Sequence, residues 1–172
     1  WFDDDSFAGA TFALGSNATN FENIEGSKFS DTLTGDAGDN VINGDSSDNY
    51  GNAGDVLYGL AGNDTLLGGV GNDTLDGGLG RDTITTGPDT DTIVTRAGDG
   101  GASEAEADVI TDFTDGTDII GLAGGLSYGE LTIDQGEGDH VNDVIVKRGA
   151  EFLLVIQNQQ VANITDLDFE DI

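Results

Sequence analysis

One large aliphatic residue recurs every nine positions along the middle of the chain, and mainly small or polar residues fill the intervals. The recurring residues are Leu57, Leu66, Leu75, Ile84 and Ile93. A fixed period of this length indicates an internal repeat rather than an amphipathic helix. Threonines beside the aliphatic residues give the alternation of a short strand, and the preceding glycines are typical of a turn.

A single nine-residue phrase is too short to bury its own aliphatic side chain, whereas stacked phrases can build a continuous core. Two phrases, eighteen residues, would complete one coil with a strand in each of two facing sheets. This arrangement predicts one ladder of Leu57, Leu75 and Ile93 and an opposing ladder of Leu66 and Ile84. The fold class predicted for the chain is therefore all-β.

An acidic residue stands two positions before each aliphatic residue, at position six of the phrase. These residues are Asp55, Asp64, Asp73, Asp82 and Asp91. Stacked coils would bring them together along two edges, at about the strand spacing of 4.8 Å. Carboxylates at that distance repel one another unless a cation lies between them. An earlier register, displaced by six extra residues near 44–49, puts Asp31 at position six, together with Glu22 and Asn40.

The charge of the chain also favours a cation as its partner. Acidic residues outnumber basic ones 34 to 5, which gives a formal net charge of −29 and argues against nucleic acid or an anionic lipid surface as partner. With no cysteine and one histidine, zinc, copper and iron–sulfur sites are disfavoured. Several calcium ions fit better than magnesium, because calcium accepts six to eight carboxylate and carbonyl oxygens. The alternative is that aspartate and glycine only form turns. No apolar stretch is long enough for a membrane span.

The phrases GLAGNDTLL and GGVGNDTLD resemble the G-G-x-G-x-D-x-U-x repeat of the RTX (repeat-in-toxin) family, where U is a large aliphatic residue. The resemblance implies a right-handed parallel β-roll that holds calcium between successive turns. The ligands it implies are the carboxylates at position six, including Asp31, and oxygens of turn residues. The turn residues are Gly59, Ala61, Gly62, Gly68, Val70, Gly71, Gly77, Leu79 and Gly80.

Two segments interrupt or end the regular array. Residues 44–49, with Asp45 and Asp48, form either a plain loop or an additional ion site. The phrase at 86–90 lacks the glycine pair, so we expect the regular array to stop near residue 94. Residues 95–107 are then expected to be a flexible or lid-like connection.

The remaining residues are predicted to close the open end of the stack, which would otherwise expose its core. Short strands are expected over 108–113 and 118–122, joined by a turn, followed by a meander over 130–134, 143–148 and 151–157. The segments DVITDF and ITDLDFEDI resemble the carboxy-terminal region of serralysin-type metalloproteases and the R-modules of alginate epimerases. That resemblance implies an antiparallel β cap that carries a type I secretion signal. Asp112 and Asp118 are either ligands of a further ion or solvated turn carboxylates.

The expected organisation is a lead-in over 1–16, repeats over 17–94, a linker over 95–107, and a capping and secretion region over 108–172. The expected function is a calcium-binding module of a larger bacterial protein, secreted or at the cell surface, that folds on calcium after export by the type I secretion apparatus. The alternative is a polysaccharide-binding R-module or the end of a surface-layer protein or adhesin. His140 stands without a catalytic partner motif, so any catalytic activity is expected in an amino-terminal domain outside this sequence.

Overall fold

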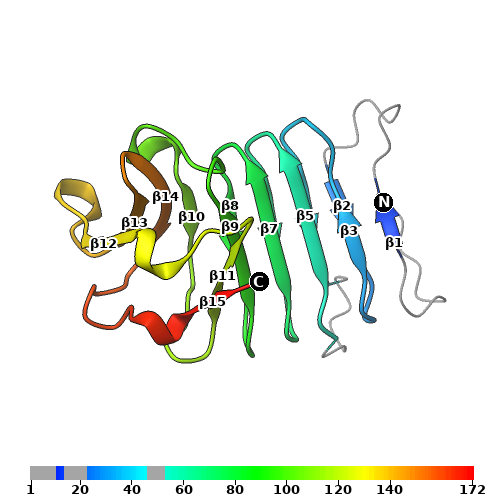
Figure 1. The fold of residues 1–172 in the computed structure, drawn as a ribbon. Helices are drawn as coiled ribbons and strands as arrows, with labels where there is room; N and C mark the ends of the chain where they lie inside the picture. Colours follow the sequence, from blue (N-terminus) through cyan, green and yellow to red (C-terminus); the bar gives the residue numbers. More distant parts are fainter. Residues whose placement is uncertain (1–10, 14–22, 46–52) are drawn as a thin grey trace.

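Two β-sheets face each other along the stack in a computed structural model, which describes residues 11–13, 23–45 and 53–172 (Figure 1). One sheet has the order β1-β3-β5-β7-β9-β11-β15. Its strands are Thr11–Ala13, Thr32–Thr34, Val56–Ala61, Thr74–Leu79, Thr92–Arg96, Ile119–Ala123 and Phe169–Asp171. Glu22, Asp48 and most of the lead-in over 1–16 lie outside the described residues.

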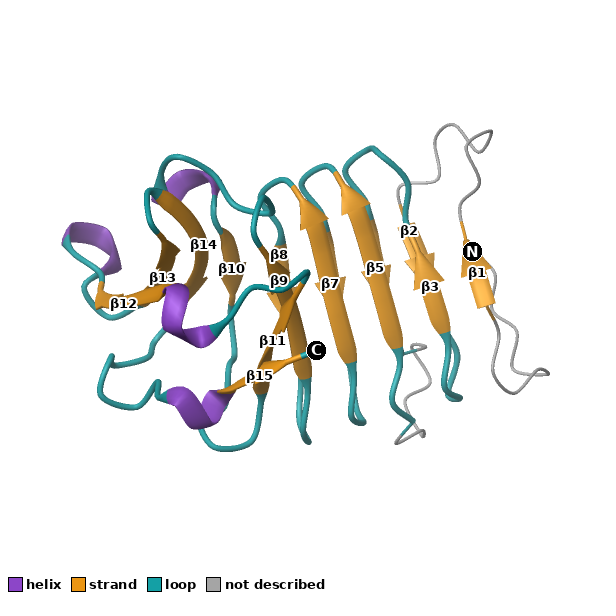
Figure 2. Cartoon of the chain, in the orientation of Figure 1, coloured by secondary structure: helices purple, strands orange, loops and turns teal. Residues whose placement is uncertain are grey.

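The other sheet has the order β12-β13-β14-β10-β8-β6-β4-β2. In the same order, its strands are Leu131–Gln135, Val144–Arg148, Glu151–Ile156, Asp108–Ile110, Thr83–Thr85, Thr65–Leu67, Val41–Asn43 and Asn23–Glu25. Within the described ranges the only helical elements are short 3₁₀ turns, η1 to η4 (Figure 2). They are Glu104–Glu106, Tyr128–Glu130, Gly138–His140 and Asp166–Asp168. The all-β prediction is therefore confirmed. None of the helices in these ranges has the length and apolarity needed to cross a membrane.

The eighteen-residue coil is confirmed by the pairing of parallel strands. Leu57 pairs with Leu75 and Leu75 with Ile93 in one sheet, and Leu66 pairs with Ile84 in the other. Upstream, Leu33 pairs with Leu57 and Ile42 with Leu66, so the extra residues after β4 lengthen one coil without breaking the register. The polar and apolar faces of the strands therefore stay aligned along the whole stack.

The core is a thin layer between the two sheets. The aliphatic side chains at position eight are fully buried from Leu33 to Ile93, and the threonines beside them are half-buried on the outer faces. The same core continues into the carboxy-terminal part through Ile110, Ile120 and Phe113. Each coil contributes only two large apolar side chains, so burial of apolar surface stabilises each coil weakly.

The roll continues for one coil beyond the regular repeats. β10 pairs in parallel with β8, and β11 pairs in parallel with β9. The strand predicted at 108–113 is shorter than expected, and the one predicted at 118–122 is shifted by one residue; the two lie in opposite sheets, so they extend the roll rather than begin the cap. The end of the glycine repeat at residue 94 is therefore not the end of the stack.

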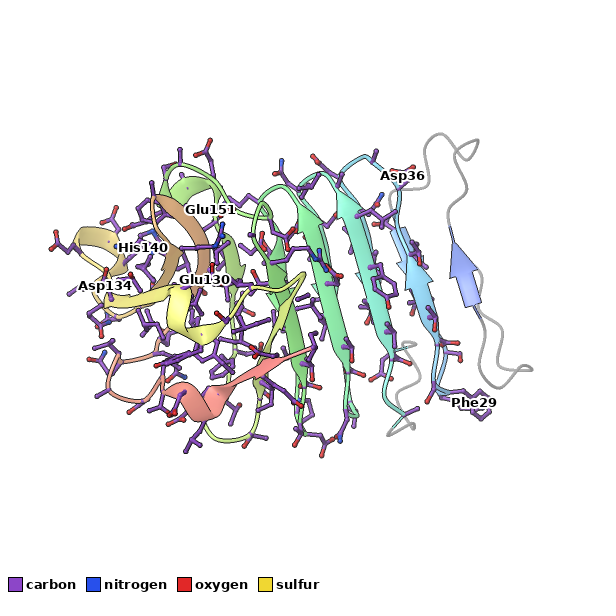
Figure 3. The ribbon with its side chains drawn as sticks, viewed as in Figure 1. Phe29, Asp36, Glu130, Asp134, His140 and Glu151 are labelled. Atoms are coloured by element: carbon purple, nitrogen blue, oxygen red, sulfur yellow. The ribbon has the colours of Figure 1, made fainter. Side chains whose placement is uncertain are left out.

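The cap covers the carboxy-terminal end of the stack. β12, β13 and β14 form the expected antiparallel meander, and β14 joins the roll in parallel beside β10. The chain returns through η4 (Asp166–Asp168) to β15, which pairs in parallel with β11. Of the residues labelled in Figure 3, Asp36 lies near the opposite end of the stack, whereas His140, Glu130 and Asp134 lie in the cap.

The connection over 95–107, expected to be lid-like, is instead bound to the cap. Gly101 forms a bridge with Phe152, and the backbone N–H of Gly98 donates a 2.7 Å hydrogen bond to Oε1 of Glu151. Its 3₁₀ turn η1, Glu104–Glu106, leads directly into β10. These contacts hold the connection against β14.

Candidate metal centre

The five aspartates at position six are buried in the turns that precede strands. Asp55, Asp73 and Asp91 precede β5, β7 and β9, whereas Asp64 and Asp82 precede β6 and β8. All five are at most 2 % exposed. The two edges predicted from the repeat are thus present, each with a column of buried carboxylates.

Backbone hydrogen bonds fix one oxygen of each carboxylate. The N–H of Asp55 donates to Oδ1 of Asp73 at 2.7 Å, and the N–H of Asp73 donates to Oδ1 of Asp91 at 2.8 Å. On the other edge, the N–H of Asp64 donates to Oδ1 of Asp82 at 2.7 Å. Each carboxylate is therefore oriented by the backbone of the preceding coil.

The second oxygen of the same carboxylates has no protein partner. Within the described residues, the buried Oδ2 atoms without a hydrogen bond include those of Asp55, Asp64, Asp73, Asp82 and Asp91. A buried charged oxygen with no donor costs several kcal/mol, roughly, unless a cation compensates it. The repetition of this arrangement in five turns indicates a ligand rather than a local defect.

A backbone cradle lies beside these oxygens. A Cβ built on Gly44, Gly59 or Gly68 would come within 3.0 Å of the position-six Oδ2 of its own phrase and of a carbonyl oxygen one coil further on. None of these three glycines has positive φ. They are therefore required for space, and carboxylate and carbonyl oxygens face the same small volume.

The other predicted turn residues divide by position. A Cβ built on Gly77 would come within 3.0 Å of Oδ2 of Asp82, while Gly62, Gly71 and Gly80, at position four, have φ of 116°, 133° and 127° and allow the backbone to turn. Ala61, Val70 and Leu79 lie between the two kinds of glycine, at position three. Their role as carbonyl ligands stays a prediction.

Burial makes the ionised form of these carboxyl groups unfavourable. Desolvation raises the pKa of Asp55 and of Asp91 to about 7, and that of Asp64 and of Asp73 to about 6. The pKa of Asp82 is also raised, mainly by burial. Neighbouring carboxylates add to the shift at Asp55 and Asp91. A divalent cation would reverse this preference by supplying the missing positive charge.

Two predicted ligands at the ends of the array are already satisfied by backbone donors. The N–H of Ser27 donates to Oδ2 of Asp31 at 2.6 Å, and the N–H of Thr114 donates to Oδ2 of Asp118 at 2.7 Å. Asn40 accepts in the same way from the N–H of Asp36, at 2.8 Å. Their turns thus differ from the five central ones, whose position-six Oδ2 atoms receive no such donor.

Asp112 and Asp45 accept hydrogen bonds from backbone N–H groups of turns in a neighbouring coil. Asp112 accepts from the N–H of Thr86 at 2.9 Å and from the N–H of Gly87 at 3.0 Å. Oδ2 of Asp45 accepts from the N–H of Val70 at 2.8 Å. Asp112 is therefore not the solvated carboxylate considered above; it ties the last, glycine-poor turn to the segment that follows β10.

Sequence reasoning missed Asp108. This residue is 2 % exposed, its Oδ1 accepts from the N–H of Asp82 at 2.9 Å, and burial raises its pKa to about 8. It occupies position six of the additional coil, with Ile110 in the core two residues later. The spacing of Asp108 and Ile110 matches that of Asp82 and Ile84, but without preceding glycines the phrase is not recognisable as a repeat.

The carboxylate and carbonyl oxygens of these turns suit calcium better than a metal that is held by side chains alone. In the described part of the chain, no three His, Cys, Asp or Glu side chains gather as a metal site. A cation in these turns would therefore draw on backbone carbonyls as well as on the carboxylates at position six. Calcium accepts this mixture in flexible geometry, whereas zinc requires nitrogen or sulfur ligands in a tetrahedron.

Comparison with known proteins agrees with the repeat. The family model for the RTX calcium-binding nonapeptide repeat, in four copies, matches residues 19–50, 49–84 and 67–100. No curated protein sequence matches significantly. The extracellular lipase LipA from Serratia marcescens is similar in fold, with a TM-score of 0.55 and 21 % identity over 80 % of this chain. The chain spans 20 % of that lipase.

Two epimerase subunits from Azotobacter vinelandii are also similar. The AlgE6R3 subunit of the mannuronan C5-epimerase has a TM-score of 0.42 and 24 % identity, covering 91 % of this chain and 82 % of its own. The AlgE6R2 subunit has a TM-score of 0.46 and 23 % identity, covering 85 % of this chain and 90 % of its own.

Proposed function

We propose that this chain is a folding module that responds to calcium in a larger extracellular protein, because residues 19–100 match the family model for RTX calcium-binding nonapeptide repeats. The observation that carries the proposal is the two columns of buried, unpartnered Oδ2 atoms at Asp55, Asp64, Asp73, Asp82 and Asp91 among the described residues. Bound calcium supplies positive charge and open coordination positions for these oxygens.

Electrostatic repulsion makes the calcium-free roll unfavourable. The chain carries a formal charge of −29, and its stacked turns bring buried carboxylates within one strand spacing of each other. Each coil buries only two large apolar side chains, too few to offset this repulsion and the ordering of many glycines. The repeats therefore stay unfolded until calcium binds.

Calcium then drives folding by mass action. An ion that binds the folded roll and not the unfolded chain stabilises the fold in proportion to the logarithm of its concentration. Typical extracellular sites bind with dissociation constants of roughly 10⁻⁴ to 10⁻³ M, which separates low cytosolic calcium from millimolar calcium outside the cell. An unfolded acidic repeat can pass through a type I secretion channel and fold after export. Residues 17–94 would then form the calcium-dependent roll. Residues 108–172 would form the capping and secretion region.

The experiment is a calcium titration of the whole chain, followed by far-UV circular dichroism. We expect little β signal in excess chelator and a cooperative gain of β signal at millimolar calcium, with magnesium at the same concentration far less effective. Equal β content in chelator and in calcium would contradict the proposal.

A further inference from the structure

Asn43 is the only asparagine of the sequence that a glycine follows. The backbone nitrogen of the residue after an asparagine can attack the side-chain amide carbon, which closes a succinimide ring and releases ammonia. A glycine in that position favours the attack, because it has no Cβ to hinder the approach and lets the backbone bend. The amide of Asn43 is therefore the one in this chain most prone to ring closure.

In the folded roll, the attacking nitrogen is already engaged. The N–H of Gly44 donates a 2.8 Å hydrogen bond to the carbonyl oxygen of Leu67, and the carbonyl oxygen of Asn43 accepts one of 2.8 Å from the N–H of Gly26. Asn43 ends β4 and pairs with Leu67 on one side and with Glu25 on the other. Ring closure requires the nitrogen to lose its proton and the backbone to leave the extended conformation. The paired strands therefore block the reaction.

The roll also has no room for the product. Water opens the succinimide to aspartate or to isoaspartate, whose main chain is longer by the Cβ carbon. A Cβ built on Gly44 would already lie 2.5 Å from Oδ2 of Asp55 and from the carbonyl oxygen of Gly68. Isoaspartate at residue 43 would therefore displace the cradle beside Asp55. Aspartate there would put a carboxylate opposite Glu25.

The strand that carries Asn43 lies near the amino-terminal end of the stack. β4 is next to β2, the last strand of its sheet in the described part of the chain, whereas the cap covers the other end (Figure 1). A coil at the end of a stack has a neighbour on one side only, so it opens more readily than a central coil. The pair Asn43–Gly44 thus depends on the integrity of a weakly held end.

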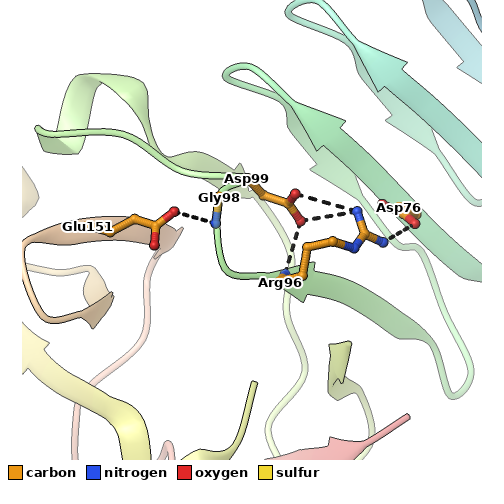
Figure 4. Close-up of polar contacts among 5 residues, drawn as sticks. All are labelled: Asp76, Arg96, Gly98, Asp99 and Glu151. Carbon is orange, nitrogen blue, oxygen red and sulfur yellow. Dashed lines mark hydrogen bonds and ion pairs between the residues drawn. The ribbon is translucent and has the colours of Figure 1, made fainter. Parts of the chain in front are cut away.

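Aspartates that precede glycine are less prone to the same ring closure. These residues are Asp76, Asp99 and Asp115. An ionised carboxylate is a poorer electrophile than an amide, and ring closure there would release water. In the fold, the guanidinium of Arg96 also holds two of them, because it donates to Oδ2 of Asp76 and, at 3.3 Å, to Oδ2 of Asp99 (Figure 4). Conversion at Asn43 can therefore be followed separately.

We propose that Asn43–Gly44 is a site of spontaneous modification that is closed in the calcium-bound roll and open in the calcium-free chain. The nitrogen of Gly44 bonds to Cγ of Asn43, the amide nitrogen leaves with the Gly44 proton as ammonia, and water then opens the ring. The inference rests on the proposed function, because calcium controls the site through folding. A chain that stays without calcium therefore loses, with time, the ability to build the coil of β4 and the cradle beside Asp55.

Peptide mapping by mass spectrometry tests the proposal on the whole chain. Samples are kept at pH 8 in excess chelator, in calcium, and in calcium with enough guanidinium chloride to unfold the chain. We expect the amide-to-acid mass change at Asn43 in chelator and in denaturant. In calcium alone it should be about tenfold slower or more, because a reaction through the opened state follows the population of that state. Asn72 and Asn163, which precede aspartate and isoleucine, are internal controls and should convert far more slowly in the unfolded samples.

Asn43→Thr separates this reaction from general ageing of the chain. Threonine suits the position, since Asn43 pairs with Leu67 and Leu67 pairs with Thr85 in the same column of the sheet. After equal times in chelator, return to calcium should restore the circular dichroism signal of the variant. The signal of the wild-type chain should fall in step with conversion at Asn43. Asn43→Gln, which closes a ring far more slowly, should behave like the threonine variant and replaces it if the latter does not fold.

Three outcomes would overturn the proposal. They are equal conversion of Asn43 in the folded and the unfolded chain, no conversion in the unfolded chain, and full refolding of converted chain in calcium. A chain that folds fully in chelator would instead refute the proposed function. The denatured sample would then still decide whether folding closes the site at Asn43.

Discussion

The backbone N–H of Asp55 donates a 2.7 Å hydrogen bond to Oδ1 of Asp73, one coil further along the stack. Oδ2 of Asp73 is buried and has no hydrogen-bond partner among the described residues. One carboxylate thus joins two coils through one oxygen and offers the other to a cation. Because every coil orients the ligand of the next, we expect ion binding and the addition of coils to be cooperative.

Asp73→Asn removes the charge and keeps an oxygen that can accept the hydrogen bond from Asp55. We expect the calcium midpoint of folding to rise about tenfold, because a charged ligand contributes more than a neutral one. The measurement is isothermal titration calorimetry together with circular dichroism. Asp139→Asn, an exposed aspartate in the cap, is the matched control and should leave the midpoint unchanged. Equal midpoints for the two variants would argue against Asp73 as a ligand.

Gly68→Ala tests the space beside the carboxylate. The added Cβ would come within 3.0 Å of Oδ2 of Asp73 and of the carbonyl oxygen of Thr86. We expect a loss of about 1–3 kcal/mol in calcium-bound stability and a higher calcium midpoint. Gly129→Ala, where nothing lies within 4 Å of the new Cβ, is the matched control. Chemical denaturation in calcium measures the stability of both variants. A tolerated alanine at residue 68 would exclude the proposed cradle.

The ladder of Leu57, Leu75 and Ile93 could be predicted because one aliphatic residue per nine leaves a single way to build a core. The two roles of glycine could not be separated, since Gly68 at position one and Gly71 at position four look the same in a sequence. Only the structure distinguishes a glycine needed for space from one needed for positive φ.

Ligands at the ends of the array were harder to predict for a different reason. Asp31 and Asp118 have the same spacing to an aliphatic residue as Asp73, but in their turns a backbone N–H points at Oδ2. That direction depends on the local turn conformation, which the acidic spacing does not specify. Asp108 was missed because its turn is a 3₁₀ segment rather than a glycine turn.

Leu60→Gly is expected to stabilise the roll. Leu60 has φ of 80°, a conformation that costs a residue with a Cβ about 1 kcal/mol or more, and its side chain is 50 % exposed. Glycine would relieve the strain, with a net gain of up to about 1 kcal/mol in calcium. Leu79→Gly, at a similarly exposed leucine without positive φ, should instead destabilise the fold. Thermal denaturation of both variants measures the two changes in stability. A loss of stability in Leu60→Gly would contradict backbone strain at Leu60.

Acid should partly replace calcium. In the folded roll, burial raises the pKa of Asp55 and of Asp91 to about 7 from the ordinary 3.8. The folded state without calcium therefore binds protons that the unfolded chain releases, so the contribution of these two groups to stability is fully present below pH 3.8 and is lost as the pH rises through 7.

Circular dichroism in chelator should accordingly show more β structure at pH 5 than at pH 8. Calcium should bind more weakly at pH 5 than at pH 8. Calcium binding near pH 6 should release protons from the carboxyl groups. Calorimetry in buffers that differ in their heat of ionisation detects these protons. A β signal in chelator that stays constant or falls on acidification would contradict the raised pKa values as the source of the calcium requirement.

A crystal structure of the whole chain grown in calcium, with anomalous diffraction data to locate the ions, tests the calcium ligands most directly. We predict calcium within about 2.3–2.6 Å of the Oδ2 atoms of Asp55, Asp64, Asp73, Asp82 and Asp91, and no ion at Asp112. A roll whose five Oδ2 atoms contact no calcium would contradict the assignment of these oxygens as the ligands on which its folding depends.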